Sequence, residues 1–413
     1  MRLPIAVAAL ALLTSCVTPA PPVDPNVPPD GAWVCADEQT GYLAAADPSK
    51  VIRDPQGRAE LVVETKPAPA NVVRASAALV SQLEARGLAD VKPVTVGGLG
   101  IRSSGPHVFT GYGDTAAALS VATLPEVLRV TPNTVKRLSD PKPGTKASDG
   151  WPADRVNQRA LPLDGNRQTL GDGTGIHVYV IDTGVNKGWI DGEVGEGWAY
   201  DGGDARDGHG HGSFVAGEIA DKRYGIAPKA IIHPVKVLDS DGYGTDLSVY
   251  RGQEWAREHA LANGWADRSV WNESLGGTTS ALIDGSVCAA VAAGLVPVLA
   301  AGNDGPVGEA CQGSPARVWE AITVGASDRW DDLADFSSGG PCVNIHAPGV
   351  CVDSVNGSCW NGTSMATPVV AATMALFKER GFSKADLYAA ATKDALSSSR
   401  GAVNWLVYAP PPE

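Results

Sequence analysis

Basic residues are scarce in this chain of 413 residues. It has 33 Lys and Arg against 46 Asp and Glu, a formal net charge of -13 at pH 7. Proteins that bind nucleic acid or anionic membranes through charge need a basic patch, because Lys and Arg hold the phosphate groups. No such patch offsets the acidic balance, so nucleic acid and acidic lipid surfaces are excluded as main partners.

The sequence also lacks an apolar run at its start that is long enough to span a bilayer. A transmembrane helix needs about 20 apolar residues, and the first apolar stretch has ended by Cys16. Residues 1–15 have the features of an export signal, and Leu13-Thr14-Ser15-Cys16 resembles a bacterial lipoprotein signal, which implies lipid on the sulfur of Cys16. An ordinary secretory signal cleaved slightly later is the alternative. We expect a protein anchored by lipid in the bacterial cell envelope, or an extracellular one.

Three catalytic motifs are missing. No H-E-x-x-H occurs, so His209 and His211 lack the further ligands that a zinc site needs. Only one D-T-G is present, at Asp182, whereas aspartic proteases need two carboxylates that share a proton. Ser364 is followed by Met365-Ala366 and is not part of a G-x-S-x-G elbow, which argues against an esterase of the α/β-hydrolase type.

The first half of the chain divides into a Pro-rich spacer, residues 16–57, and a run of strand-like and helix-like pieces over residues 58–138. These pieces follow a β-α-β-β-α-β order, which predicts a small α+β domain with ferredoxin-like topology: AELVVE, NVVRASAALVSQLEARG, VKPVTV, HVFTGYG, DTAAALSVATL and VLRVTPNTV. A generic α+β binding module has the same pattern. Residues 139–150, rich in Pro, Gly, Ser and Lys, are interpreted as a linker or processing region.

Residues 151–413 contain short apolar runs that end in polar or Gly-rich residues. With helical patterns such as DLSVYRGQEWAREHALANG between them, they predict a parallel sheet with helices on both faces. The runs are GIHVYVID, AIIHPVKVLD, SVWNESLGG, LVPVLAAGN, AITVGAS and VNIHAPG. In such α/β folds, functional sites gather at the carboxyl ends of the strands.

Four side chains stand at such ends or at a helix start. Asp182 ends one predicted strand, and Asn303 ends another. His211 precedes a helix of small residues and can act as a general base near neutral pH. Ser364 precedes an apolar helix in which Pro368 is expected near the start, where its missing N–H costs nothing. A helix N-terminus favours developing negative charge, which suits an acyl-transfer nucleophile.

The blocks VIDTG, DGHGHGSFVAG, SLGG, AAGN, SPA and GTSMATP resemble, in this order, those of the subtilisin-like serine proteases, particularly the proteinase K and aqualysin branch. The resemblance covers nearly all of residues 150–408. It implies that Ser364 attacks the peptide carbonyl, that His211 transfers the proton, and that Asp182 orients His211. It also implies that Asn303, with the backbone N–H of Ser364, holds the oxyanion. No cofactor is required for this chemistry.

The resemblance further implies a substrate cleft with two edges, between which an extended peptide adds as a strand. One edge is Gly242-Tyr243-Gly244 and the other is Ser274-Leu275-Gly276. Ala301-Gly302 and Gly313-Ser314 would border the first specificity pocket, and their small size predicts room for a large apolar side chain. Residues 58–138 would be an inhibitory propeptide removed by self-cleavage between about Leu138 and Gly150.

The chain departs from the family pattern at three positions. Phe214 and Val369 stand where the family usually has histidines, and we expect them to pack together between the two active-site helices. Asn344 stands where relatives of proteinase K have a carboxylate ligand of calcium. An amide is neutral and would weaken that site, so structural calcium is possible but poorly supported.

Six cysteines remain besides Cys16, and export favours disulfides. The placement of Cys311 and Cys342 resembles an aqualysin-type disulfide, and Cys351 could pair with Cys359 in a hairpin before the nucleophile. Cys35 and Cys288 are left; free thiols are favoured over a bond between them, although the sequence does not decide.

We therefore expect a monomeric serine endopeptidase with broad, apolar-leaning specificity, exported as a self-processing zymogen. Its partners would be protein or peptide substrates and its own propeptide, and the membrane only through the lipid. The alternative from another class is a surface lipoprotein that binds ligands through an inactive protease fold. The intact set of Asp182, His211, Asn303 and Ser364 argues against it.

Overall fold

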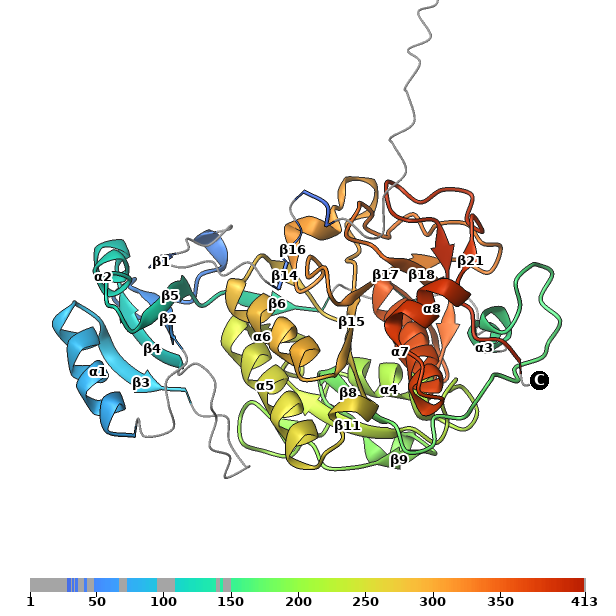
Figure 1. Ribbon diagram of the computed structural model, residues 1–413, viewed down its shortest axis with the longest axis horizontal. Coiled ribbons are helices and arrows are strands. Elements are labelled where there is room, and N and C mark those ends of the chain that lie inside the picture. Colours follow the sequence, from blue (N-terminus) through green and yellow to red (C-terminus); the bar gives the residue numbers. More distant parts are fainter. Residues whose placement is uncertain are drawn as a thin grey trace, which may run out of the picture.

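The computed structural model describes residues 28–30, 32, 34–35, 41–42, 48–66, 73–94, 108–138, 142–143 and 150–411 (Figure 1). The predicted signal, the lipidation site Cys16 and most of the spacer and linker lie outside these residues. In the part of the chain that is described, no helix is both long and apolar enough to cross a bilayer.

The larger part of the molecule is built on a ten-stranded sheet with the order β10-β11-β8-β13-β15-β17-β18-β22-β21, and β9 also pairs with β11. All neighbours are parallel except the last pair, β21 and β22. The six longer strands coincide with the six predicted apolar runs, and this confirms the α/β fold with a mostly parallel sheet: β8 (His177–Asp182), β11 (Ile231–Lys236), β13 (Ser269–Glu273), β15 (Val296–Ala300), β17 (Ile322–Ser327) and β18 (Ile345–Pro348).

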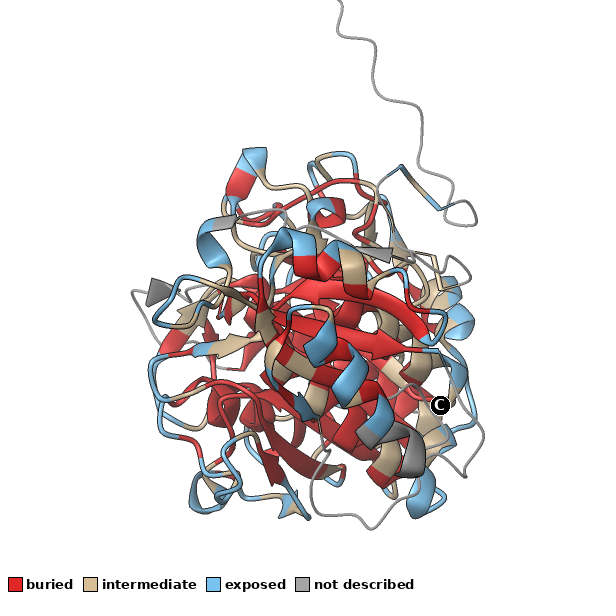
Figure 2. Ribbon diagram, turned by 90° about the vertical axis from the view of Figure 1, so that its left-hand side faces the viewer, coloured by how far each residue is buried: buried red, intermediate tan, exposed pale blue. Residues whose placement is uncertain are grey.

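Helices cover both faces of this sheet, as predicted (Figure 1). On one face lie α4 (His211–Ala220) and α7 (Thr363–Glu379), and on the other α5 (Asp246–Ala262) and α6 (Ala281–Ala292). Side chains alternate along a strand, so Val178 and Val180 of β8 join the core under α4 and α7, while Tyr179 and Ile181 join the core under α5 and α6. The strand is therefore buried along its whole length, and Figure 2 shows the buried sheet between the helices.

Shorter elements complete the larger part. They include α3 (Trp151–Val156), α8 (Lys384–Ala390), β9 (Glu193–Val194), β10 (Trp198–Ala199), β12 (Tyr243–Thr245), β14 (Gly277–Thr278), β16 (Gly313–Ser314), β19 (Val352–Asp353), β20 (Cys359–Asn361), β21 (Thr392–Lys393) and β22 (Trp405–Leu406).

A second, smaller sheet has the order β1-β5-β2-β4-β3. Its last four strands, with two helices, have the ferredoxin-like arrangement expected from the sequence: β2 (Ala59–Thr65), α1 (Val73–Ala85), β3 (Ala89–Pro93), β4 (Val108–Gly113), α2 (Thr115–Val121) and β5 (Val127–Pro132). The Asp114 carboxylate caps α2 by accepting from Ala117 N at 2.8 Å. The edge strand β1 (Gly41–Tyr42) pairs with β5, so part of the predicted spacer belongs to this sheet.

The small sheet lies against the two helices α5 and α6. Val62 and Val108 of the sheet share a buried cluster with Tyr250 and Leu282 of the helices. Beside it, the buried Arg129 pairs with Glu64 at 2.6 Å. The two parts are also joined along the chain by β6 (Val135–Arg137) and β7 (Lys142–Pro143), which pair with strands of the larger part.

Three disulfides are present. Cys311–Cys342 and Cys351–Cys359 confirm the two predicted pairs. Cys35 and Cys288, which the sequence favoured as free thiols, are also bonded. The Cys35 backbone N–H reaches the Glu320 carboxylate, at 3.1 Å from each oxygen, so tertiary contact brings together two cysteines that are 253 residues apart.

Candidate active site

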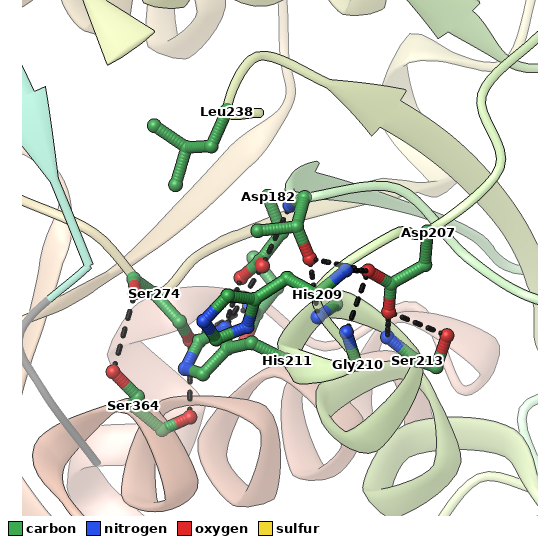
Figure 3. A network of polar contacts seen from close by, with 12 residues as sticks. Asp182, Asp207, His209, Gly210, His211, Ser213, Leu238, Ser274 and Ser364 are labelled. Atoms are coloured by element: carbon green, nitrogen blue, oxygen red, sulfur yellow. Dashed lines mark hydrogen bonds and ion pairs between the residues drawn. The ribbon is translucent and has the colours of Figure 1, made fainter. Parts of the chain in front are cut away.

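Asp182 and His211 meet at the carboxyl edge of the large sheet. Asp182 is the last residue of β8 and His211 the first of α4, and both side chains are fully buried. Nδ1 of His211 lies 2.8 and 2.9 Å from the two carboxylate oxygens of Asp182 (Figure 3). A carboxylate only accepts, so Nδ1 carries the hydrogen and Nε2 has the lone pair. Nε2 is buried without a hydrogen-bond partner among the described residues, and can accept a proton.

Asp207 fixes the loop that leads into α4. Its carboxylate accepts from the side chain of Thr183 at 2.9 Å, from His209 N and Gly210 N, and from both N and Oγ of Ser213. Burial raises the pKa of Asp207, but these donors outweigh it, and the net shift of the pKa is downward. The sequence motif contains this residue, yet its positioning role was missed.

Ser364 is the second residue of α7. Pro368 is the sixth, so the expectation that this proline lies in the first turn is wrong. Proline has no N–H to donate to the carbonyl four residues earlier, which is that of Ser364. Oγ of Ser274 donates to this carbonyl instead, at 3.1 Å. A residue of the predicted cleft edge therefore compensates for a proline within the helix.

The Ser364 hydroxyl donates to the backbone carbonyl of Ser274 at 3.2 Å (Figure 3). The structure thus brings Ser364 to the cleft edge, and α4 packs directly against α7. No hydrogen bond joins Ser364 to His211 among the described contacts, although both lie at the same edge of the sheet.

Asn303 follows β15 and is oriented by the residue before Ser364. Its Oδ1 accepts from both N and Oγ1 of Thr363, each at 2.9 Å. The amide nitrogen of Asn303 lies beside Gly362, since a Cβ built on this glycine would be 3.4 Å from Nδ2. An amide N–H group is therefore held next to the start of α7.

The chain's own strand β6 lies between the two predicted cleft edges. Arg137 pairs with Tyr243 on one side and with Gly276 on the other. Leu138 N donates to Gly242 O at 3.0 Å, and the Leu138 side chain is buried in one cluster with Leu275. The remaining predicted cleft residues, Gly244, Ser274, Ala301 and Gly302, lie on β12 or follow β13 and β15.

β7 continues past the site on its other side. Lys142 and Pro143 pair with Asn361 and Trp360 of β20, shortly before Ser364. The chain is therefore held by β-pairing on both sides of the Ser364 hydroxyl.

Phe214 of α4 and Val369 of α7 both belong to the large core on this face of the sheet, and their direct contact stays a prediction. The ring of Phe214 also stacks on Trp360, with centroids 4.6 Å apart. Trp360, which sequence reasoning did not single out, lies 6.1 Å from the His211 ring by the same measure.

Asn344 stands where the family implies a calcium ligand. Its Oδ1 accepts from Thr323 N at 2.7 Å, and the amide carries no charge. Within the described ranges, the one cluster of three His, Cys, Asp or Glu ligand atoms is Cys35, Cys288 and Glu320, and its cysteines form a disulfide. Structural calcium at Asn344 therefore stays a prediction.

Comparisons with known proteins agree with this geometry. The model of the subtilase family matches residues 173–403. An extracellular serine proteinase of Thermus sp. (strain Rt41A) is 39% identical over 279 residues, which are 63% of this chain and 66% of that protein. Alkaline serine exoprotease A of Vibrio alginolyticus is 38% identical over 276 residues, 62% of this chain and 50% of that protein. The chain thus spans between half and two thirds of the length of these relatives.

A solved structure, that of a cold adapted subtilisin-like serine proteinase, superposes with a TM-score of 0.58 at 37% sequence identity. The superposed region covers 64% of this chain and 99% of the chain in the solved structure.

Proposed function

Because the chain belongs to the subtilase family, we propose that it is a serine endopeptidase whose nucleophile is Ser364. The observation that carries the proposal is the buried contact of Asp182 with His211 Nδ1, at 2.8 and 2.9 Å, which leaves the lone pair of Nε2 available as a base. In the proposed reaction the Ser364 hydroxyl turns from Ser274 O to this nitrogen, and such contacts commonly tighten only when substrate is bound.

In the proposed reaction, Ser364 Oγ attacks the carbonyl carbon and its proton moves to His211 Nε2. Asp182 stabilises the imidazolium through Nδ1–H. The oxyanion receives hydrogen bonds from Asn303 Nδ2 and from the backbone N–H of Ser364, an N–H with no intrahelical partner because it is at the helix start. His211 then gives the proton to the leaving amine, and water hydrolyses the acyl-enzyme by the same steps in reverse.

The same proposal makes the small domain an inhibitory propeptide. Support comes from β6, which occupies the cleft as an added strand, and from β7, which pairs on the far side of Ser364. Since the chain is held on both sides, the bond cut in self-processing would lie between Leu138 and Lys142. The Thermus relative is named as extracellular, which supports export; lipid on Cys16 and a monomeric state complete the proposal.

Labelling with a fluorophosphonate tests the nucleophile. We expect the wild-type protein, once its cut small domain has been digested, to be labelled and to digest casein, and Ser364→Ala to do neither. N-terminal sequencing should find a new terminus after residue 138 and no later than residue 142 in the wild type only. Labelling of both proteins would contradict the assignment of Ser364 and indicate another nucleophile. Labelling of neither would also contradict it and would favour the inactive-fold alternative.

A further inference from the structure

A fully buried lysine of the inhibitory segment points into the larger part of the molecule. Lys136 is 0% exposed. Its Nζ lies 2.7 Å from Oδ1 of Asp246, and donates to Thr278 O at 2.7 Å and to Thr134 Oγ1 at 3.3 Å. Lysine is almost never fully buried unless it is paired. The protein thus holds a built site for an ammonium group.

The walls of this site come from two elements of the larger part, α5 and β14, and from the residues before β14. Asp246 is the first residue of α5, and Thr278 belongs to β14. Gly277 makes room for the aliphatic stem, because a Cβ there would lie 2.9 Å from Cδ of Lys136. Leu275, in the cleft edge that precedes Gly277, is buried and apolar.

Asp246 is the carboxylate that forms the ion pair with the ammonium group of Lys136. The nearby Asp284 has one oxygen engaged, since its Oδ2 accepts from Arg317 Nε at 2.7 Å and from Ser314 Oγ at 2.8 Å. The second oxygen of Asp246 accepts from Thr134 N at 2.8 Å and from Thr134 Oγ1 at 2.5 Å. Both Lys136 and Thr134 belong to the proposed propeptide, so its removal after processing takes away the cationic partner of a carboxylate that is 3% exposed.

Strand register makes this place available to substrates. Lys136 pairs with Gly244, and the next residue, Arg137, pairs with Gly276. An extended peptide bound between the same edges places one of its residues opposite Gly244, where Lys136 lies in this structure. Because side chains alternate along a strand, the side chain of that residue would point in the same direction as Lys136, toward Asp246. A neutral side chain there would leave the carboxylate without a counter-charge, which is costly in a dehydrated site.

We propose that Asp246 is the specificity-determining residue of a subsite that selects lysine or arginine at the substrate position opposite Gly244. The inference rests on the proposed peptidase function. It replaces, at this one position, the apolar preference expected from the sequence. The position differs from the first pocket beside Ala301 and Gly302, where the earlier expectation of a large apolar side chain still stands as a prediction.

Quenched fluorescent peptides with the sequence of residues 133–143 test this subsite. Position 136 is lysine, norleucine or glutamate; norleucine keeps the stem and lacks only the ammonium group. With processed protein whose small domain has been digested, titrated by fluorophosphonate, we expect kcat/KM to be at least about tenfold higher for lysine than for norleucine, and lowest for glutamate.

Asp246→Asn should bring the lysine-to-norleucine ratio near one while norleucine peptides are still cleaved. Asp241→Asn is the matched control, because it removes an exposed carboxylate from the neighbouring loop and should keep the ratio. If Asp246→Asn does not fold, the lysine-to-norleucine ratio of kcat/KM in the wild type decides whether the subsite prefers an ammonium group. Equal cleavage of the lysine and norleucine peptides by protein that digests casein would overturn the subsite. Failure to digest casein would instead count against the peptidase.

Discussion

At the scale of single residues, Ser274 links the helix of the nucleophile to the cleft edge. It donates to Ser364 O and accepts from Ser364 Oγ. The first of these bonds exists because Pro368 supplies no N–H to that carbonyl. The two positions should therefore be coupled in stability, although they are far apart in the sequence.

We expect Ser274→Ala to lower the free energy of unfolding by about 1–3 kcal/mol, the usual penalty for leaving a buried carbonyl without a donor. In a Pro368→Ala background the helix regains its own N–H, so the same change should cost less. A double-mutant cycle by urea unfolding measures the difference. Ser364→Ala must be present in all four proteins to prevent self-digestion. Equal costs in both backgrounds would contradict the coupling.

Sequence reasoning named the residues proposed for the reaction because each stands in a recognisable local block. It could not name Asp246 or Asp207 as functional residues. Asp246 is an ordinary first-turn acid of a predicted helix, and its partner Lys136 lies about a hundred residues earlier in what looks like a strand. Such a pairing is set by the docking of two domains, which no local pattern encodes.

At the scale of elements, β8, β11 and α5 carry a buried group of histidines away from the candidate site. Nδ1 of His177 lies 2.9 Å from Nε2 of His233, and Nδ1 of His233 lies 2.8 Å from Glu196 O. Trp265 stacks on His177, and the Tyr179 hydroxyl contacts His259. Burial lowers the pKa of His177 and of His233 to about 4.

These shifts predict acid sensitivity. Between about pH 6.5 and pH 4 the unfolded chain binds protons at His177 and His233 that the folded chain does not, so unfolding becomes easier as the pH falls. Each such group contributes up to about 1.4 kcal/mol per pH unit. His177→Gln should make the pH dependence of the unfolding free energy less steep in this window. The exposed His209 is the control, and an equal change for His209→Gln would contradict the explanation.

The longer strands could be predicted from the sequence because two buried faces require continuous apolar runs. The two-residue strands such as β9, β10 and β14 could not, since their pairing depends on partners distant in the chain. The helix α6 was also missed: it lies between two predicted strands, and its ALIDGSVCAAVA sequence is buried on much of its surface and has little polar pattern.

At the scale of the whole molecule, the two domains are joined in three ways. The small sheet packs on α5 and α6, β6 lies in the cleft, and Cys35 is bonded to Cys288 of α6. Sequence reasoning favoured free thiols here without deciding, and it could not find this pairing because the two cysteines are 253 residues apart. Cutting the chain between Leu138 and Lys142 would leave this bond intact.

We therefore predict that processed protein migrates as one species of about full size in a denaturing gel without reductant and as two pieces with reductant. Cys35→Ser should give two pieces under both conditions. Ser364→Ala, which is not cut, should remain single throughout. Separation of the wild-type pieces without reductant would show that the disulfide does not hold them.

For an inhibitor that is covalently bonded to its enzyme, the bound fraction does not depend on the protein concentration in the solution. Once cut, a propeptide held only by packing would escape on dilution, but one fastened through Cys35–Cys288 keeps a constant effective concentration beside the cleft, however few molecules are present. Activity would then begin when the small domain is digested or the bond is reduced. The onset of activity would depend on proteolysis or reduction and not on dilution of the protein after export.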